Sequence, residues 1–345
     1  MQRLAKALAS NGATTQVLEF NKYACLRNRP ILSLFPSPKL LPAIVSFHPD
    51  IVFTDIYNYD SWGSKLAAYP ILAHMRGDYW TEFTYLYLTR TRYSSLFMKW
   101  ATFWLKFVTE RGIDFAHTIL PICGWLAKQV KEHRPRKRIR VLYQPIEPRI
   151  WLREQSEERI VLKMVLKHPA VISVFDFNIL PKVQGFIRFL NVTRKMPQLN
   201  FYIAGSGPYF NHVLSQNPPQ NVKFLGQLPY PNGVKAFLKT GDLYVHPSGQ
   251  DACPLTVMEA ELMKMAVVAT DVGGVPEVVG DKRFLVKDGD TEGWMSKIQY
   301  LLDHPEERER AGSVNRHYIE TGFSMDKIAG ELFVYMKEVL EKDGQ

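Results

Sequence analysis

Short apolar runs alternate with helical patterns along almost the whole chain, and this alternation predicts parallel strands covered by helices. In the first half, the expected strands lie at residues 16–20, 51–54, 71–75, 118–122 and 139–143, and the expected helices at 40–47, 60–69, 92–111 and 125–133. In the second half, the expected strands lie at 171–175, 200–204, 222–225, 243–246 and 266–270, and the expected helices at 183–195, 233–239, 255–263 and 290–303. Further helices end the chain.

The length and one break in this alternation indicate two domains. A chain of 345 residues fits two α/β domains of about 150 residues better than one core. A Pro- and charge-rich stretch at 144–149 is the predicted linker. We therefore expect an α/β fold with doubly wound, Rossmann-like domains at 1–150 and 151–323. A C-terminal helix at 324–345 could cross back to the first domain.

The composition is that of a globular protein, with 46% hydrophobic and 22% charged residues. We find no apolar run long enough for a membrane span, and the first residues lack the apolar core of a signal peptide. The three cysteines are odd in number and far apart, which favours a reducing, cytoplasmic setting.

The charge is unevenly distributed. Residues 1–150 hold 21 Lys and Arg against 10 Asp and Glu, whereas residues 151–345 hold 22 against 24. A basic half suggests an anionic partner. The dispersed charge and the lack of a recognised module argue against nucleic acid. An anionic membrane surface, a phosphate-bearing acceptor and a merely solvated basic surface stay open.

Two segments of the basic half bear on membrane binding. The helix expected at 92–111 carries an aromatic face that includes Phe103 and Phe107. A helix at a membrane surface has this pattern, but so does a helix packed on its sheet, and we favour packing. The basic run at 131–140 is interpreted as a solvated loop.

The most informative segment is 246–260, where a strand, a polar loop and a helix follow one another. Pro254 suits the first helical position, and the N–H groups that open such a helix bind anions. Asp251 precedes the helix and Glu259 lies inside it, which suits a diphosphate ligand that also carries hydroxyl groups. A capping Asp and a solvated Glu explain the spacing equally well. Glycine pairs also follow the strands that end near residues 204 and 270, although each alone is more often a turn.

Together these segments resemble the family-4 retaining glycosyltransferases. The matching residues are Pro247-Ser248, Asp251, Pro254-Leu255, Glu259-Ala260, Val267-Val268-Ala269-Thr270, Gly273-Gly274 and Pro276-Glu277-Val278-Val279. Further landmarks are Ala204-Gly205-Ser206-Gly207-Pro208, Phe224-Leu225-Gly226 and Gly322-Phe323-Ser324. The resemblance implies the GT-B architecture, in which two Rossmann-like domains face a cleft.

The resemblance also implies roles for individual residues. Lys182 would neutralise the leaving phosphates, Glu259 would bind the donor ribose, and Asp251 would reach toward the donor sugar. The remaining donor-binding positions would be Gly205, Gly207, Leu225, Ala252, Cys253, Pro254, Leu255 and Thr256. The donor would be a nucleoside-diphosphate sugar, and neither a cofactor nor a metal is expected.

Four departures from the family pattern stand out. Asp251 replaces the usual glutamate, and Lys264 replaces a glycine that ends a helix. Phe177 stands where a phosphate-binding arginine is usual. The first strand and its glycine-rich loop are missing before Met1, so the chain either lacks about twenty residues or begins late.

The acceptor side is less defined. His74, Arg76 and Asp78 follow or end the strand at 71–75, near the place of a family histidine. Arg76 and Asp78 could bind an acceptor phosphate or hydroxyl, or could pair to hold the loop, and the two interpretations weigh equally.

The function predicted from these features is retaining transfer of a sugar from a nucleotide sugar to a sugar or lipid-linked acceptor. The enzyme would be cytoplasmic, with peripheral attachment to the inner face of the membrane as a further hypothesis. The rivals are a GT-B sugar-nucleotide epimerase and a catalytically impaired binding subunit. A dehydrogenase is disfavoured because no G-x-G-x-x-G fingerprint follows a strand. The aspartates of Asp288-Gly289-Asp290 lie in an expected turn and are assigned no metal.

Overall fold

The computed structural model describes residues 2–17, 40–55, 69–81, 96–152 and 166–343. The chain divides into two compact units, Met1–Gln144 with Met325–Gln345, and Pro145–Ser324. The sequence placed this division at residue 150. The strand expected at 16–20 and the helix expected at 60–69 lie mainly outside the described residues.

The first unit contains a parallel sheet in the order β1-β2-β3-β4. Its strands are β1 (Val52–Asp55), β2 (Ile71–Met75), β3 (Thr118–Pro121) and β4 (Arg138–Ile139). Its helices are α1 (Gln2–Ser10), α3 (Leu40–Phe47), α7 (Leu96–Phe115), α8 (Gly124–His133) and α18 (Met325–Asp343). Leu4 and Leu8 of α1 pack with Ile328 and Leu332 of α18 in a core that also contains Leu72 of β2.

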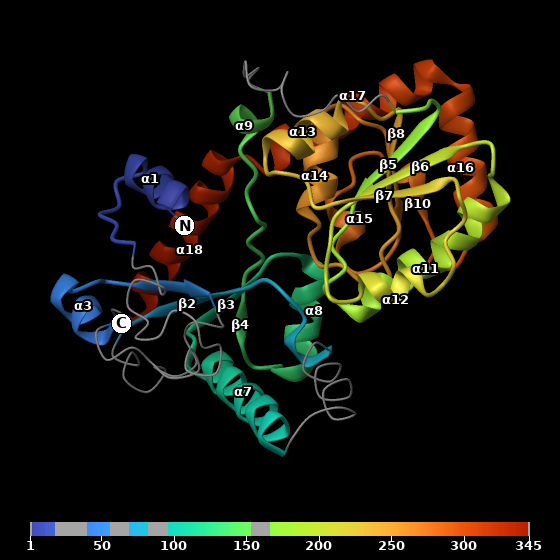
Figure 1. Ribbon diagram of the computed structural model, residues 1–345. Helices are drawn as coiled ribbons and strands as arrows, with labels where there is room; N and C mark the ends of the chain where they lie inside the picture. Colours follow the sequence, from blue (N-terminus) through green and yellow to red (C-terminus); the bar gives the residue numbers. More distant parts are fainter. Residues whose placement is uncertain (1, 18–39, 56–68, 82–95, 153–165, 344–345) are drawn as a thin grey trace. The chain divides into compact units, whose positions relative to one another are not determined.

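The second unit is a six-stranded parallel sheet in the order β10-β9-β8-β5-β6-β7 (Figure 1). Its strands are β5 (Ala170–Val174), β6 (Asn200–Ala204), β7 (Val222–Gly226), β8 (Leu243–His246), β9 (Val267–Thr270) and β10 (Leu285–Val286). The chain runs outward from β5 to β7, returns to β8, and then runs outward in the other direction. Because β5 and β8 are neighbours, the order of the strands reverses between them.

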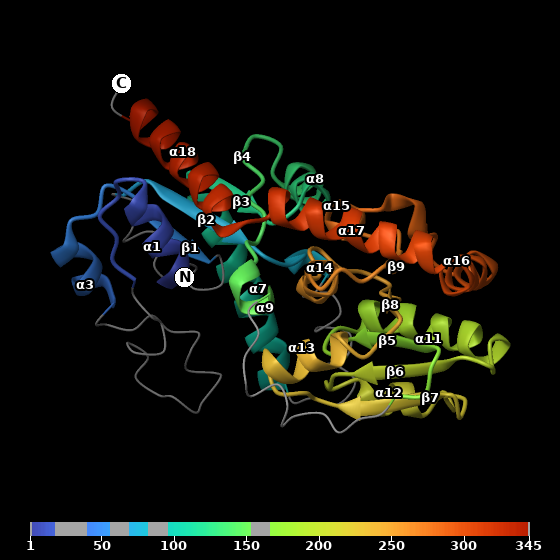
Figure 2. The ribbon, with the colours of Figure 1, turned by 90° about the horizontal axis from the view of Figure 1, so that it is seen from above.

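Helices cover both faces of this sheet, as Figures 1 and 2 show. Right-handed crossovers place the helices of the two halves on opposite faces, because the strand order runs in opposite directions. The helices are α9 (Pro148–Leu152), α11 (Leu180–Lys195), α12 (Phe210–Leu214), α13 (Asn232–Leu238), α14 (Leu255–Leu262), α15 (Val275–Val278), α16 (Thr291–Asp303) and α17 (Pro305–Gly322). Helix α11 packs with α16, and α14 packs with α17.

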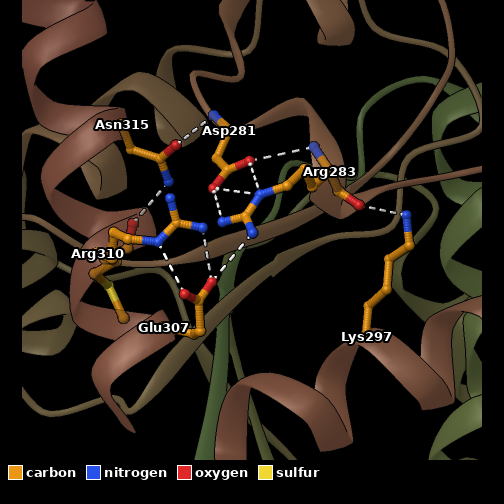
Figure 3. A network of polar contacts seen from close by, with 7 residues as sticks. Asp281, Arg283, Lys297, Glu307, Arg310 and Asn315 are labelled. Atoms are coloured by element: carbon orange, nitrogen blue, oxygen red, sulfur yellow. Dashed lines mark hydrogen bonds and ion pairs between the residues drawn. The ribbon is translucent and has the colours of Figure 1, made fainter. Parts of the chain in front are cut away.

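A polar network fixes the far edge of this sheet to the helices (Figure 3). Arg283 pairs with Asp281 at 2.7 Å and with Glu307 at 3.1 Å, and Arg310 also pairs with Glu307. The Asn315 amide accepts the Asp281 N–H and donates to a backbone carbonyl of residue 265. The network joins the segment before β10 to α17 and to the chain just before β9.

The turn after α14 confirms one predicted departure. Lys264 has φ of +60°, the left-handed conformation that a glycine would adopt at no steric cost. A Cβ on Gly312 of α17 would overlap the Lys264 carbonyl, so the two helices approach closely there. The chain therefore keeps the turn of the family without its glycine.

Helix α7 does not match its expected packing. Phe103 is 67% exposed and Phe107 43% exposed, so the prediction that this face packs on the sheet is wrong for both residues. The buried side of the helix contains Thr109 and Ile113 instead. Arg111 lies 5.7 Å from the centre of the Phe107 ring.

The basic run at 131–140 is only in part a solvated loop, because it includes the end of α8 and the strand β4, while Lys131, Arg136 and Arg140 stay exposed. Arg134 pairs with Asp114 at 2.6 Å, and both Arg138 and Arg140 pair with Glu338. The ammonium groups of Lys131 and Lys137 donate to backbone carbonyls. The run therefore joins β4 to α7 and α18.

Candidate donor site

The reversal of strand order between β5 and β8 defines the place of the site. In doubly wound sheets, the loops at the carboxyl ends of the two strands on either side of such a reversal diverge and leave a binding crevice. The loop after β5 leads to Lys182 in the first turn of α11, and the loop after β8 contains Asp251. The topology therefore brings together two residues that lie 69 positions apart in the chain.

Lys182, Asp251 and His246 form one connected group at this point. The Lys182 ammonium lies 2.8 Å from Oδ2 of Asp251, and Nε2 of His246 lies 3.2 Å from the same oxygen. The ammonium also lies 5.4 Å from the centre of the Phe175 ring. The carboxylate of Asp251 thus holds the lysine at the carboxyl edge of the sheet.

The electrostatics of this group follow from its burial. Burial alone would raise the pKa of Asp251, but the charge of Lys182 and the contact with His246 outweigh it and hold the pKa well below its usual range. Burial lowers the pKa of His246, despite the opposing effect of Asp251. At neutral pH the group is therefore a Lys–Asp ion pair beside a neutral imidazole.

Close packing of glycines places the Asp251 loop. A Cβ on Gly185 of α11 would overlap the backbone of Gly249, and the Gly249 N–H donates to the carbonyl of Lys182 at 3.1 Å. Gly273 has φ of +56°, and a Cβ there would overlap the Asp251 carbonyl. That carbonyl accepts the Gly274 N–H at 2.9 Å. The paired glycines after β9 therefore contact the acidic loop rather than open space.

The helix that follows the loop is α14, with Pro254 as its N-cap. The sequence analysis predicted Pro254 as the first residue of the helix, whereas the structure begins the helix at Leu255. The N–H groups of Leu255 and Thr256 begin the helix, where no intrahelical acceptor exists, so they can bind an anion. Ala252 and Cys253 lead into this turn, and Cys253 is buried.

Glu259 lies one turn further along α14 and is only 4% exposed. The hydroxyl of Tyr230 donates to its Oε1 at 3.1 Å. Burial raises the pKa of Glu259 to about 8, although the hydrogen bond from Tyr230 opposes this change. Sequence reasoning missed Tyr230 and His246, since neither a loop tyrosine nor a strand-end histidine carries a periodic signal.

The remaining predicted donor residues line the other half of the sheet. Leu225 lies in β7, and its neighbour Gly226 accepts the Gly205 N–H at 2.7 Å. Cβ atoms on Gly205 and Gly207 would overlap the backbones of Phe175 and Phe177. These two glycines therefore allow the loops after β5 and β6 to lie in contact.

Phe177 explains how the chain accommodates the loss of the usual arginine. Its ring is fully buried and lies against the rings of Phe175, Phe186, Phe210 and Phe224. The position has become part of the hydrophobic core and cannot present a side chain to a phosphate. The positive charge at this edge of the described site therefore comes from Lys182 and from helix N–H groups.

The acceptor-side candidates lie in the first unit. His74 of β2 is 3.2 Å from the carbonyl of Leu142 through Nε2. The carboxylate of Asp78 accepts the N–H and the hydroxyl of Thr81, so it caps the short helical turn at residues 79–81. Arg76 is exposed just after β2. This geometry supports a structural role for Asp78 and tests no acceptor role.

The aspartates at 288 and 290 both have partners in the fold. Asp288 pairs with Arg188 at 2.6 Å, and Asp290 caps α16 through the Gly293 N–H. Across the described ranges, no group of three or more His, Cys, Asp or Glu side chains is arranged to hold a metal ion. None of the described helices is both long and apolar enough to cross a bilayer.

Comparison with known proteins identifies the second unit. The family described as "Glycosyl transferases group 1" matches residues 155–318. N-acetyl-alpha-D-glucosaminyl L-malate synthase of Bacillus anthracis is 24% identical over 67% of this chain and 62% of its own. The GDP-mannose-dependent monoacylated alpha-(1-6)-phosphatidylinositol monomannoside mannosyltransferase of Corynebacterium glutamicum is 32% identical over 39% of this chain and 38% of its own.

The chain thus spans less than two thirds of the length of these curated relatives. The structure of sucrose-phosphate synthase from Thermosynechococcus elongatus superposes with a TM-score of 0.71 at 17% identity. That likeness covers 99% of this chain and 92% of the synthase, and it establishes the GT-B fold.

Proposed function

The chain belongs to the group 1 glycosyltransferases, and we propose that it transfers a sugar from a nucleoside-diphosphate sugar to an acceptor hydroxyl with retention of configuration. The observation that carries the proposal is the Lys182–Asp251 pair beside the N-terminus of α14. A departing diphosphate gains negative charge, and a fixed ammonium and unpaired N–H groups stabilise that charge.

Lys182 can serve a phosphate without leaving Asp251. An ammonium group has three N–H donors, and Asp251 takes one of them at 2.8 Å. Two donors remain for phosphate oxygens, while the pairing keeps the ammonium in place. The shorter Asp251 side chain, which stands where glutamate is usual, is suited to this positioning role more than to contact with the donor sugar.

Retention is proposed from the resemblance to the retaining family, and the engagement of the two nearby carboxyl groups favours a route without a covalent intermediate. Asp251 is bound to Lys182 and His246, and Glu259 is bound to Tyr230, so neither is placed as a covalent nucleophile. In the proposed step the bond from the anomeric carbon to the phosphate oxygen breaks. A bond to the acceptor oxygen forms on the same face, and the acceptor proton passes to the leaving phosphate.

Product analysis tests the proposal. The protein is incubated with UDP- and GDP-sugars and with sugar or lipid-linked acceptors, and the anomeric configuration of the product is read by NMR. A product with the configuration of the donor supports retaining transfer. Conversion of the donor without an acceptor would indicate an epimerase, and nucleotide binding without turnover would indicate an impaired binding subunit.

We expect transfer to survive EDTA, because Lys182 and the N–H groups of α14 stabilise the leaving charge without a metal. Initial rates are compared with and without about 5 mM EDTA, which is a large excess over trace metal. They are measured again after addition of Mg²⁺ or Mn²⁺. Loss of activity with EDTA and recovery with either ion would place the leaving charge on a metal.

Peripheral attachment to an anionic membrane belongs to the same proposal. The mannosyltransferase from Corynebacterium glutamicum is named for a lipid acceptor. In this chain, Phe103 and Phe107 expose aromatic surface on α7, within a unit of positive net charge. Aromatic and basic side chains together suit the headgroup region of a bilayer.

Sedimentation with anionic liposomes tests this attachment. We expect binding at low salt, weaker binding at high salt, and loss of most binding in the Phe103→Glu/Phe107→Glu variant. Val314→Glu, which changes an exposed residue of α17, is the matched control. Reversal of the basic run would be a poor test, since it breaks the ion pairs of Arg134 and Arg138. Equal sedimentation with neutral and anionic vesicles would contradict the electrostatic contribution.

A further inference from the structure

Tyr230 links the solvent to the most buried carboxyl group of the donor site. The residue is 67% exposed, yet its hydroxyl lies 3.1 Å from Oε1 of Glu259, which is 4% exposed. The ring therefore presents apolar surface to the solvent while its hydroxyl reaches a buried acid, an arrangement that suits a side chain with an apolar body and a polar end. The hydrogen bond to Tyr230 is the one that Glu259 makes through its side chain within the described residues.

The loop that contains Tyr230 is anchored on both sides. The carbonyl of Pro229 accepts the Gly233 N–H at 2.7 Å, and the carbonyl of Pro231 accepts the Lys235 N–H at 2.9 Å. The ring also meets the buried side chain of Trp151, with the two ring centres 5.9 Å apart in an edge-to-face arrangement. The position of Tyr230 is thus set by α13 on one side and by α9 on the other.

We propose that Tyr230 is a positioning residue that orients Glu259 for the donor ribose. The proposal rests on the proposed function of the site. An ionised carboxyl group accepts about four hydrogen bonds, and ribose hydroxyls that donate to Glu259 favour its ionised form, so the bond from Tyr230 leaves room for two of them. Without Tyr230, the carboxyl group loses its hydrogen-bond partner and must be oriented by the ligand itself.

Titration calorimetry with UDP and GDP tests this role without the need for turnover. Loss of one hydrogen bond typically weakens binding by up to about tenfold, and we expect this for Tyr230→Phe. Tyr230→Ala, which also removes the ring contact with Trp151, should bind more weakly still. Tyr300→Phe is the matched control, because Tyr300 lies in α16 and its ring stacks on His304 at the end of that helix. Thermal unfolding of each variant shows that the fold is kept.

A double-mutant cycle separates positioning through Glu259 from a direct contact. If Tyr230 acts through Glu259, then Tyr230→Phe should add almost nothing to the loss already caused by Glu259→Gln. In kinetics, Tyr230→Phe should raise the donor KM and leave the acceptor KM unchanged. Independent losses in the cycle, or parent-like affinity in both Tyr230 variants, would overturn the proposal. If the parent protein binds neither nucleotide, then it is the proposed function that fails.

Discussion

Replacing Lys182 with alanine should lower the rate of sugar transfer by about 100-fold or more, which corresponds to about 3 kcal/mol of transition-state stabilisation. The expected loss is large because the position where the resemblance expects a second cation holds Phe177, which is buried in the aromatic cluster. The measurement is kcat with the best donor from the product analysis. Turnover close to that of the parent in a folded Lys182→Ala protein would remove the residue from the mechanism.

The same substitution also affects stability, and the controls must separate the two effects. Lys182 and Asp251 form a mostly buried ion pair, and removal of one partner from such a pair typically costs about 3–5 kcal/mol of unfolding free energy. The Lys182→Met/Asp251→Asn variant removes both charges, so it should regain stability and stay inactive. Lys195→Ala, on the same helix, breaks the exposed pair with Glu292 and should change either property by less than about 1 kcal/mol.

The second unit was predictable from sequence in most of its elements. Strands such as β5 and β6 are mostly buried and mainly apolar runs, which are easily recognised between helical patterns. The strand β10 was missed because two residues are too few to show a period. The short helix α9 was assigned to the linker because prolines and charges obscure its single turn. The fold itself followed from the alternation and from the resemblance.

The contacts inside the site were not predictable in the same way. The motif that contains Asp251 and Glu259 indicated two acids around a helix N-terminus, but one partner of each acid comes from a distant part of the chain. Lys182 meets Asp251 because β5 and β8 are neighbours in the sheet, and Tyr230 meets Glu259 because the loop after β7 reaches α14. Pattern reasoning sees neighbours in the chain and cannot see such meetings.

Two predictions about the surface of the first unit were wrong in whole or in part. The aromatic face of α7 and the basic run at 131–140 were interpreted by their composition as core and as solvated loop. Phe103 is instead exposed, and Arg134 is tied to Asp114. An amphipathic pattern alone does not show what the apolar side of a helix contacts, because packing on the face of a sheet and binding at a bilayer surface favour the same residues.

Replacing Glu259 with glutamine should lower donor affinity and the rate of transfer together, with kcat/KM reduced by about 100-fold or more. Two ribose hydroxyls that donate to Glu259 favour its ionised form, which accepts through both oxygens, whereas an amide offers one acceptor and presents a donor. Glu259→Ala should lose as much, because it leaves the ribose hydroxyls without a partner. Both are measured with the donor varied at saturating acceptor. A kcat/KM close to that of the parent would separate Glu259 from donor binding.

The stability of Glu259→Gln provides the control that its activity cannot. The pKa of Glu259 is raised from its ordinary value near 4.5 to about 8 by burial, so the folded protein prefers the neutral acid. Below pH 4.5 the acid is neutral in both the folded and the unfolded chain, and the free energy of unfolding carries no penalty from it. As the pH rises toward 8, the unfolded chain ionises first, and stability is lost. Tyr230 and Tyr244 face this carboxyl group; burial raises the pKa of Tyr244, which stays neutral throughout that range, and Asp251 stays ionised beside Lys182. Glutamine removes the penalty, so the variant should melt at a higher temperature than the parent at pH 8 and at nearly the same temperature at pH 5.

An inactive protein that is more stable than its parent at pH 8 has lost the contact to the donor and not its fold. If the parent and Glu259→Gln melt at the same temperature at pH 8, then the carboxyl group is already ionised in the folded parent.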